Sequence, residues 1–330
     1  VLDTGRPGPT LALRFDIDCI PVTESTDDKH VPTHCGFASK NPGFMHACGH
    51  DAHMSMGLAV CHWLMDNKDK LSGKVKILFQ PAEEGVRGAA GMAASGILDD
   101  CDYFLSSHVA MLAKSGELAT NLYGFLCTTK YDVTFNGRAS HAGVSPQEGR
   151  NALAAAANAT VQMLGISRHG GGMTRINIGQ LVAGEGRNVI PSKAVMKLEV
   201  RGETMEINNY MSEQVTNIVE GIAKGFSVTY DMRKMGEAVD LTADQELIDI
   251  LNESGREVGL KVLDKPLNFG GSEDATILAR RVQAHGGKAA FFVWGSDRPS
   301  GHHSALFDIQ EKDMAPAFDL WTHVLPKILK

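Results

Sequence analysis

The sequence predicts an α/β fold in which a small ferredoxin-like domain interrupts a mostly parallel sheet. In the first part of the chain, short apolar runs typical of buried strands alternate with segments of helical length, and such alternation favours a parallel sheet. From about residue 128 the pattern becomes strand, helix, two strands, helix and strand. Strands and helices of the first kind then return, so the second pattern reads as an insertion.

Apolar periodicity predicts the strands and helices that lie before and after the inserted domain. Strands are expected at 11–15, 74–79 and 102–109, and helices at 53–66 and 85–98. After the insertion, a helix is expected at 244–259, a strand at 288–295 and a terminal helix at 312–329. We therefore expect one domain formed by 1–124 and 238–330.

The inserted domain, 125–237, has alternating strands and two amphipathic helices. The strands are expected at 128–137, 174–183, 193–202 and 227–235, and the helices at 151–165 and 206–225. This order is the split βαβ arrangement, which closes into a small antiparallel domain.

Composition limits the function. The 330 residues suffice for two cores, and no apolar run reaches the roughly 18 residues that would span a bilayer. A net charge of -7 without a block of Lys and Arg argues against a nucleic-acid partner. Six cysteines without CxxC spacing suggest neither disulfides nor a zinc ribbon, so the cytoplasm is the expected location.

The stretch HACGHDAHM, 46–54, is the first candidate site. Cys48 and His50 flank Gly49, so a turn there would bring both side chains toward one point. Taken alone, the stretch fits a metal-binding turn and a polar loop with a buried thiol equally well.

Three further clusters follow predicted strands, whose carboxyl ends are where ligands bind in such sheets. Glu83 and Glu84 follow the strand at 74–79, His108 ends the strand at 102–109, and His302 and His303 follow the strand at 288–295. Each cluster alone is compatible with a solvated surface or a structural histidine. Together with Cys48 and His50 they supply enough N, O and S ligands for two metal ions.

These clusters belong to a longer series of motifs, which resembles the peptidase M20 family of dinuclear metallohydrolases in its amidohydrolase branch. The series is HACGHDAH, QPAEEG, SSHV, GRASHAG, GRNVIP, GSEDA and GHHSALFD, in this order, with the inserted domain in place. The likeness covers essentially the whole chain.

The resemblance implies a role for each cluster. The implied ligands of two divalent ions, zinc or manganese, are Cys48, His50, Glu84, His108 and His303. Glu83 is implied to be the general base. Asp51, which follows His50, is expected to orient a ligand. His302 stays open as the alternative to His303.

The inserted domain carries three further candidates. The resemblance implies that His141 reaches the active site of the other chain in a dimer, where it donates to the developing oxyanion. Asn188 and Arg201 are expected to bind a substrate carboxylate, for which an arginine fork is suited. We therefore expect a homodimer or a heterodimer with a related subunit.

The resemblance implies hydrolysis of the amide bond of an N-acyl amino acid, and we expect p-aminobenzoyl-glutamate to be cleaved to p-aminobenzoate and glutamate. Two alternatives stay open: a broader N-acyl-amino-acid amidohydrolase or aminoacylase-like carboxypeptidase, and a non-catalytic partner subunit. The intact Glu83 and the full ligand set argue against the second. Family members have a helical segment before the first strand, and this N-terminal helical part is expected to be missing here.

Overall fold

The computed structural model describes residues 1–330, which divide into two units. Unit 1 consists of Val1–Phe125 and Leu241–Lys330, and unit 2 of Leu126–Asp240. The chain therefore leaves unit 1 once and returns once. No helix combines the length and the hydropathy that a membrane span needs.

Unit 1 is built on a seven-stranded sheet of order β1-β3-β2-β4-β13-β5-β11. The strands are β1 (Leu2–Asp3), β2 (Thr10–Asp16), β3 (Lys74–Gln80), β4 (Tyr103–Val109), β5 (Glu117–Ala119), β11 (Lys261–Val262) and β13 (Lys288–Trp294). The central strands β3, β2, β4 and β13 run parallel, whereas β1 and β5 pair antiparallel with β3 and β13. The predicted mostly parallel sheet is confirmed. A separate pair joins β6 (Leu122–Tyr123) to β12 (Leu267–Asn268).

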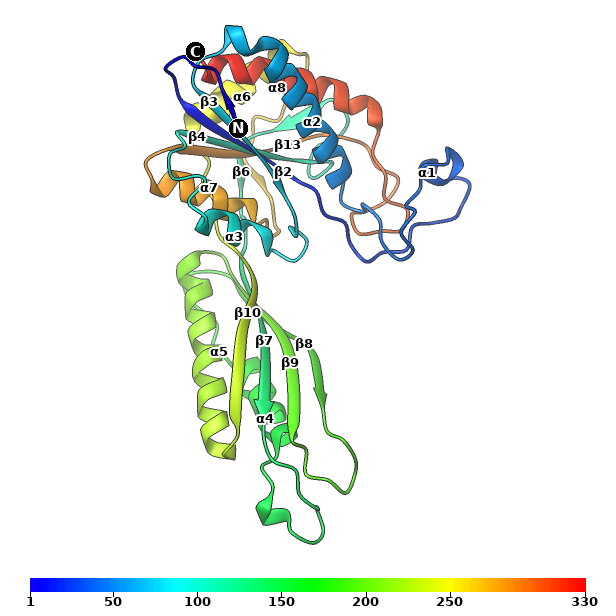
Figure 1. Ribbon diagram of the computed structural model, residues 1–330, viewed down its shortest axis with the longest axis vertical. Coiled ribbons are helices and arrows are strands. Elements are labelled where there is room, and N and C mark those ends of the chain that lie inside the picture. Colours follow the sequence, from blue (N-terminus) through cyan, green and yellow to red (C-terminus); the bar gives the residue numbers. More distant parts are fainter. The chain divides into compact units, whose positions relative to one another are not determined.

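Helices cover both faces of this sheet (Figure 1). The helices are α1 (Val31–His34), α2 (His50–Asn67), α3 (Gly88–Ala94), α6 (Gln245–Glu257), α7 (Ala275–Ala284) and α8 (Met314–Ile328). One face carries α2, α6 and α8, and the other carries α3 and α7. Because both faces are covered, the central strands are buried along most of their length.

The strand β2 shows how side chains are divided between the two faces. Leu11, Leu13 and Phe15 belong to the core under α2 and α8, where Phe15 packs on Trp321 with 5.6 Å between ring centroids. Ala12 belongs to the core under α3 and α7. Successive residues of a strand point to opposite faces, so a single strand contributes to both cores.

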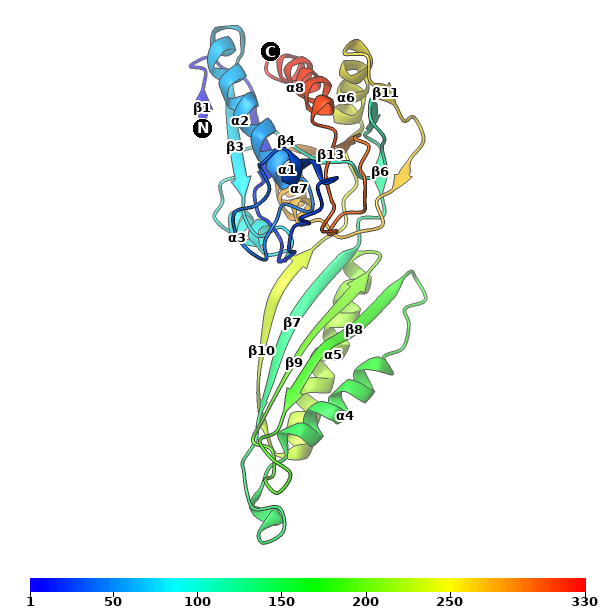
Figure 2. The ribbon, with the colours of Figure 1, turned by 90° about the vertical axis from the view of Figure 1, so that its right-hand side faces the viewer.

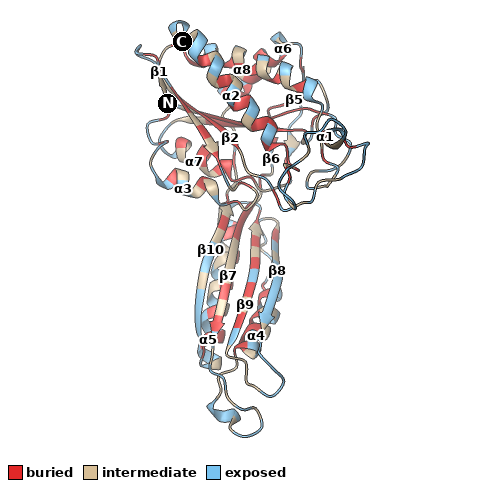
Figure 3. Ribbon diagram, turned by 45° about the vertical axis from the view of Figure 1, so that its right-hand side comes forward, coloured by how far each residue is buried: buried red, intermediate tan, exposed pale blue.

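Unit 2 is a four-stranded antiparallel sheet of order β10-β7-β9-β8 with two helices packed on one face (Figure 2). Its elements are β7 (Cys127–Asn136), α4 (Ala152–Leu164), β8 (Thr174–Ala183), β9 (Lys193–Gly202), α5 (Met205–Phe226) and β10 (Thr229–Ala238). The edge strand β8 is largely exposed (Figure 3).

One charged side chain lies at the centre of unit 1. Arg14 is fully buried on β2, and its guanidinium lies 2.7 Å from Asp16, 3.1 Å from Glu273 and 3.2 Å from Asp274. Its Nε also donates to Gln80 Oε1 at 2.8 Å. Burial lowers the pKa of Arg14, but the three carboxylates outweigh burial and raise it well above its ordinary value. The cation therefore joins β2 and β3 to the turn that precedes α7.

Replacing this cation should strongly destabilise the fold. Arg14→Met leaves three buried carboxylates without a counter-charge, and the free energy of unfolding should fall by about 3–5 kcal/mol. Urea titration followed by tryptophan fluorescence measures the change. Arg256→Met is the control, because its pair with Asp264 is exposed and should contribute less than about 1 kcal/mol. Equal losses in both variants would contradict the role given to Arg14.

Candidate metal centre

The turn before α2 positions two predicted ligands. Gly49 has φ 86° and is the N-cap of α2. A Cβ at this position would lie 2.4 Å from Cγ1 of Val109, so both the backbone conformation and the close approach require glycine. Cys48 and His50 are therefore held on either side of a sharp turn, and both are buried.

The loop between β3 and α3 carries the two glutamates. Ala82 has φ 62° and Val86 has φ 50°, which are uncommon values for residues with a Cβ. The backbone N–H of Glu84 donates to Asp18 Oδ2 at 3.1 Å. Strained backbone of this kind persists where the surrounding contacts hold it, often at functional sites.

His303 arrives from the loop after β13, again with a left-handed backbone. Its φ is 65°, and its N–H donates to the carbonyl of Ala47 at 2.7 Å. This bond fixes the loop beside the turn that carries Cys48. His108 lies at the end of β4, next to Val109.

Unit 1 brings the five expected ligands and Glu83 into one cluster. Three groups of ligand atoms, each within 4.8 Å of one another, share members: Cys48, His50 and His108; Cys48, Glu84 and His303; His50, Glu83 and Glu84. Cys48 Sγ lies 3.5 Å from His108 Nε2, and Glu84 Oε2 lies 3.1 Å from His303 Nε2. Glu83 Oε2 lies 3.9 Å from His50 Nε2.

Hydrogen bonds leave the ligand nitrogens free. His50 Nδ1 lies 3.1 Å from the carbonyl oxygen of Asp18 and 3.2 Å from its carboxylate. His108 Nδ1 lies 2.8 Å from the carbonyl oxygen of Val109. Because a carbonyl oxygen can only accept, each Nδ1 carries a proton and each Nε2 faces the cluster.

In two other groups of acids and histidines, the members that lie outside the cluster already have partners. The first is Asp16, His50 and His53, and the second is Glu83, Glu273 and Asp274. In the first, Asp16 contacts both Arg14 and His53. In the second, Asp274 accepts from Gln80 and from the N–H of Ala89. These carboxylates support the cluster, whereas the free ligand atoms lie between Cys48 and Glu84.

The electrostatics of the cluster favour a bound cation. Burial raises the pKa of the Cys48 thiol, and Glu84 and Glu83 raise it further. Burial lowers the pKa of His50, but Asp16 and Asp18 outweigh it and raise the value to about 9. A histidine that retains a proton so strongly indicates that its surroundings demand positive charge.

Glu83 is a buried carboxyl that lies among other acids. Burial raises its pKa well above the ordinary value, and the neighbouring Glu273 raises it further. Burial likewise lowers the pKa of His108 far below its ordinary value and that of His302 to about 4, so both rings are neutral.

The residues present fit a divalent metal. His50 Nε2 and Glu84 Oε1 are buried and have no hydrogen-bond partner, a costly state unless another group satisfies them. The donor set combines a thiol, imidazoles and a carboxylate, which zinc and related ions accept.

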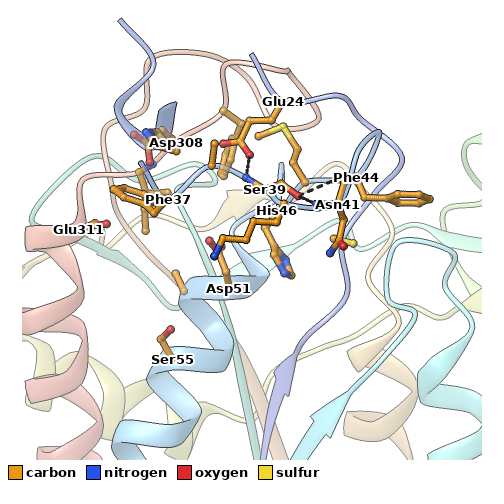
Figure 4. Close-up of a pocket in the computed structure, with 18 of the residues that line it drawn as sticks. Glu24, Phe37, Ser39, Asn41, Phe44, His46, Asp51, Ser55, Asp308 and Glu311 are labelled. Carbon is orange, nitrogen blue, oxygen red and sulfur yellow. Dashed lines mark hydrogen bonds between the residues drawn. The ribbon is translucent and has the colours of Figure 1, made fainter. Parts of the chain in front are cut away.

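Asp51 does not orient His50, which corrects the expectation from sequence. It is exposed and lines a cavity of about 520 Å³ (Figure 4). His46 lines the same cavity, which none of the expected ligands does. Neighbouring residues of a helix point in different directions, so Asp51 faces away when His50 faces the cluster. Asp18 is the residue that holds His50.

Unit 2 brings two of its three candidates together. His141 pairs with Val189, and the carbonyl of Asn188 accepts from Ala142 at 3.0 Å. Both side chains are exposed. Arg201 lies near the other end of β9, where its Nε contacts Glu199 at 3.0 Å. Asn188 and Arg201 are therefore not neighbours.

Sequence reasoning missed Asp16, Asp18 and His53, which touch or support the ligand histidines. The signal available was RFDID, 14–18, in which charged residues alternate at the end of an apolar strand. Such residues at the carboxyl end of a parallel strand lie where ligands bind.

A family model for peptidase family M20/M25/M40 matches residues 12–327. The chain belongs to this family. The predicted M20 membership, and with it the predicted hydrolase, is confirmed.

Three individual proteins are similar to this chain over nearly its whole length. A p-aminobenzoyl-glutamate hydrolase homolog of Haemophilus influenzae, named for one subunit of that enzyme, is 54% identical over 330 residues, which are 100% of this chain and 78% of that protein. The indole-3-acetyl-aspartic acid hydrolase of Enterobacter agglomerans is 44% identical over 96% of this chain and 73% of its own length. The crystal structure of the aminobenzoyl-glutamate utilization protein from Klebsiella pneumoniae matches with a TM-score of 0.81 and 36% identity, covering 99% of this chain and 73% of that one.

Metal content should distinguish the two adjacent histidines. His303 Nε2 lies 3.1 Å from Glu84 Oε2, in a group of ligand atoms that includes Cys48. His302 also approaches Cys48, with its Nδ1 3.5 Å from Sγ, but its Nε2 lies 3.2 Å from the carbonyl of Ala110 and its ring packs on Phe307. His303→Ala should lower the metal bound per chain, as Cys48→Ala should, and His302→Ala should retain it. Elemental analysis after dialysis measures this. Loss in His302→Ala with full retention in His303→Ala would reverse the assignment.

Proposed function

We propose that the protein hydrolyses the amide bond that joins an aromatic acyl group to an acidic amino acid, with p-aminobenzoyl-glutamate as its substrate. The observation that carries this proposal is the buried Glu83 at 3.9 Å from His50, beside a cluster of free thiol, imidazole and carboxylate ligand atoms. The names of the relatives from Haemophilus influenzae and Enterobacter agglomerans support the substrate class, because both describe such conjugates.

Two divalent ions, zinc or manganese, would be held by Cys48, His50, Glu84, His108 and His303, and would supply Lewis acidity for the substrate carbonyl and for water. The Nδ1–H groups of His50 and His108 are fixed by Asp18 and by the carbonyl of Val109. Both rings therefore keep one orientation toward the ligand atoms.

Glu83 moves the proton in the proposed reaction. Its carboxylate accepts a proton from the attacking water, and the water oxygen forms a bond to the amide carbon. The protonated Glu83 then donates to the amide nitrogen, and the C–N bond breaks to release the amine of glutamate. Burial, which raises the pKa of this carboxyl, suits it to hold the proton between the two steps.

The carboxylates of the glutamate moiety need cationic and amide partners. We assign Arg201 and Asn188 to this task, and His141 to hydrogen bonding with the oxyanion. From Lys193 to Arg201, β9 extends by about 27 Å at the rise of an antiparallel strand. His141 and Asn188 lie beyond Lys193, so they and Arg201 of one chain lie too far apart to hold one substrate.

We therefore propose that unit 2 is a ferredoxin-like lid and dimerisation domain, and that His141 and Asn188 act on the site of a partner chain. An unpaired edge supports this role. On the edge strand β8, Leu181 and Val182 are exposed, as are Val161 and Leu164 on α4. An apolar edge strand favours pairing with another chain. The partner is a second copy or a related chain, and the cytoplasm is the proposed location.

The two adjacent glutamates should give different phenotypes. Glu83→Gln should keep its bound metal and lose roughly 10²–10⁴-fold in kcat on p-aminobenzoyl-glutamate, because it removes the proton acceptor only. Glu84→Gln should lose metal. Released p-aminobenzoate and elemental analysis measure the two effects, with indole-3-acetyl-aspartate, benzoyl-glycine and acetylated amino acids as comparison substrates. Turnover by Glu83→Gln at the wild-type rate would remove the base assignment.

Mixing two inactive variants tests the shared site. His141→Ala and Glu83→Gln chains, refolded together, should form heterodimers in which one site has an intact Glu83 and receives an intact His141. Activity should return to a fraction of that of the wild type, measured on heterodimers purified with two different tags. Purified heterodimers that stay inactive would count against a contribution across the dimer.

A further inference from the structure

His53 is a buried histidine to which the proposed reaction gives no role. It lies on the first turn of α2 and is 2% exposed. Both ring nitrogens are used: Nδ1 lies 2.5 Å from Asp16 Oδ1, and Nε2 lies 2.9 Å from the backbone nitrogen of Val109. A ligand role would require breaking one of these bonds, so His53 is not available to a metal.

The two bonds fix the tautomer of this ring. The N–H of Val109 can only donate, so Nε2 of His53 must be the acceptor and carries no proton. The proton of the ring therefore lies on Nδ1 and is donated to Asp16. Asp16 is itself held by the guanidinium of Arg14 at 2.7 Å, which makes it a strong and immobile acceptor.

The backbone of Val109 links His53 to His108, which is one of the expected metal ligands. Its N–H is held by His53, and its carbonyl accepts from Nδ1 of the neighbouring His108 at 2.8 Å. The rings of His53 and His108 also meet edge to face, with centroids 4.7 Å apart and planes at 81°. A continuous set of bonds thus runs from Arg14 through Asp16, His53 and Val109 to His108.

We propose that His53 is a positioning residue for the metal centre. Its Nε2 lone pair holds the backbone of Val109, so that the carbonyl of Val109 fixes His108 in the Nδ1–H tautomer with Nε2 directed at Cys48. This inference rests on the proposed ligand role of His108. Removing such outer partners typically weakens metal affinity by about 10–100-fold.

Two substitutions divide the functions of the ring. The amide of His53→Gln reaches the position of Nε2 and can accept from Val109, whereas that of His53→Asn reaches only the position of Nδ1 and can donate to Asp16. If the role passes through Val109, zinc affinity should fall by about 10–100-fold in His53→Asn and by less in His53→Gln. His62→Asn and His62→Gln are matched controls, because His62 is an exposed histidine of the same helix.

The measurement is competition for Zn²⁺ between metal-free full-length protein and a chromophoric chelator, on samples whose folding is verified by circular dichroism. Equal affinity in His53→Asn, His53→Gln and the wild type would overturn the proposal, as would a greater loss in His53→Gln. A His108→Ala variant distinguishes failure of the proposed metal centre from failure of the positioning role of His53. If His108→Ala binds zinc like the wild type, the proposed metal centre fails; if it weakens zinc while His53→Asn does not, only the positioning role fails.

A second measurement uses the wild-type protein, so it does not depend on whether a variant folds. Long-range ¹H–¹⁵N spectra of histidine-labelled wild-type protein report which ring nitrogen carries the proton. His53 should be protonated at Nδ1 and unprotonated at Nε2 in the metal-free and the zinc-loaded protein. A proton on Nε2 would break the bond from Val109 and contradict the proposal.

Discussion

The buried guanidinium of Arg14 is the interaction on which the rest of unit 1 depends. It gathers Asp16 from β2 and Glu273 and Asp274 from the turn before α7 around one positive charge. Asp274 then accepts from Gln80 and from the N–H of Ala89, on either side of the loop that carries the glutamate pair. Removing charges from water is costly, so such a network persists only when each member is paired. Its pairing fixes the distance between β2, β3 and the turn before α7, and β3 leads into the loop that carries Glu83 and Glu84.

This anchoring produces a site that lacks positive charge. Arg14 is already shared among three acids, and Cys48, His50, Glu83 and Glu84 lie beyond it with unpaired or proton-holding atoms. In the absence of a metal, protons on the thiol and the imidazole lower the local negative charge. Divalent ions would do so more completely. Burial and the neighbouring glutamates raise the pKa of the Cys48 thiol, and Asp16 and Asp18 raise that of His50.

Periodicity predicted the main elements because burial on both sides leaves a clear apolar signal. The strand expected at 193–202 spans Lys193–Gly202, and β2 differs from its prediction by a single residue at each end. The helix α7 was missed because it is short and its apolar residues are interrupted by two arginines. Strands such as β11 and β12 have two residues each, too few for any pattern. Tertiary pairing, not local preference, defines them.

The site could be predicted from the sequence where a metal-binding residue type lies at or just after the carboxyl end of a predicted strand, as for Glu84 and His108. It was not predictable where contact depends on rotation about a helix axis. Asp51 is adjacent to His50 in sequence yet lines a cavity that none of the expected ligands lines, whereas Asp18, more than thirty residues away, holds the ring. A buried Arg inside an apolar strand, as in LALRF, was a stronger signal than it first looks, because an unpaired arginine is almost never fully buried.

Anomalous diffraction from crystals grown with zinc tests the two-ion centre most directly. Two peaks about 3.5–4 Å apart are expected in unit 1, one of them about 2.3 Å from Cys48 Sγ. Both should be bounded by His50, Glu84, His108 and His303, with Glu83 nearby but not coordinated. A single fully coordinated peak, or peaks that do not contact Cys48, would contradict it.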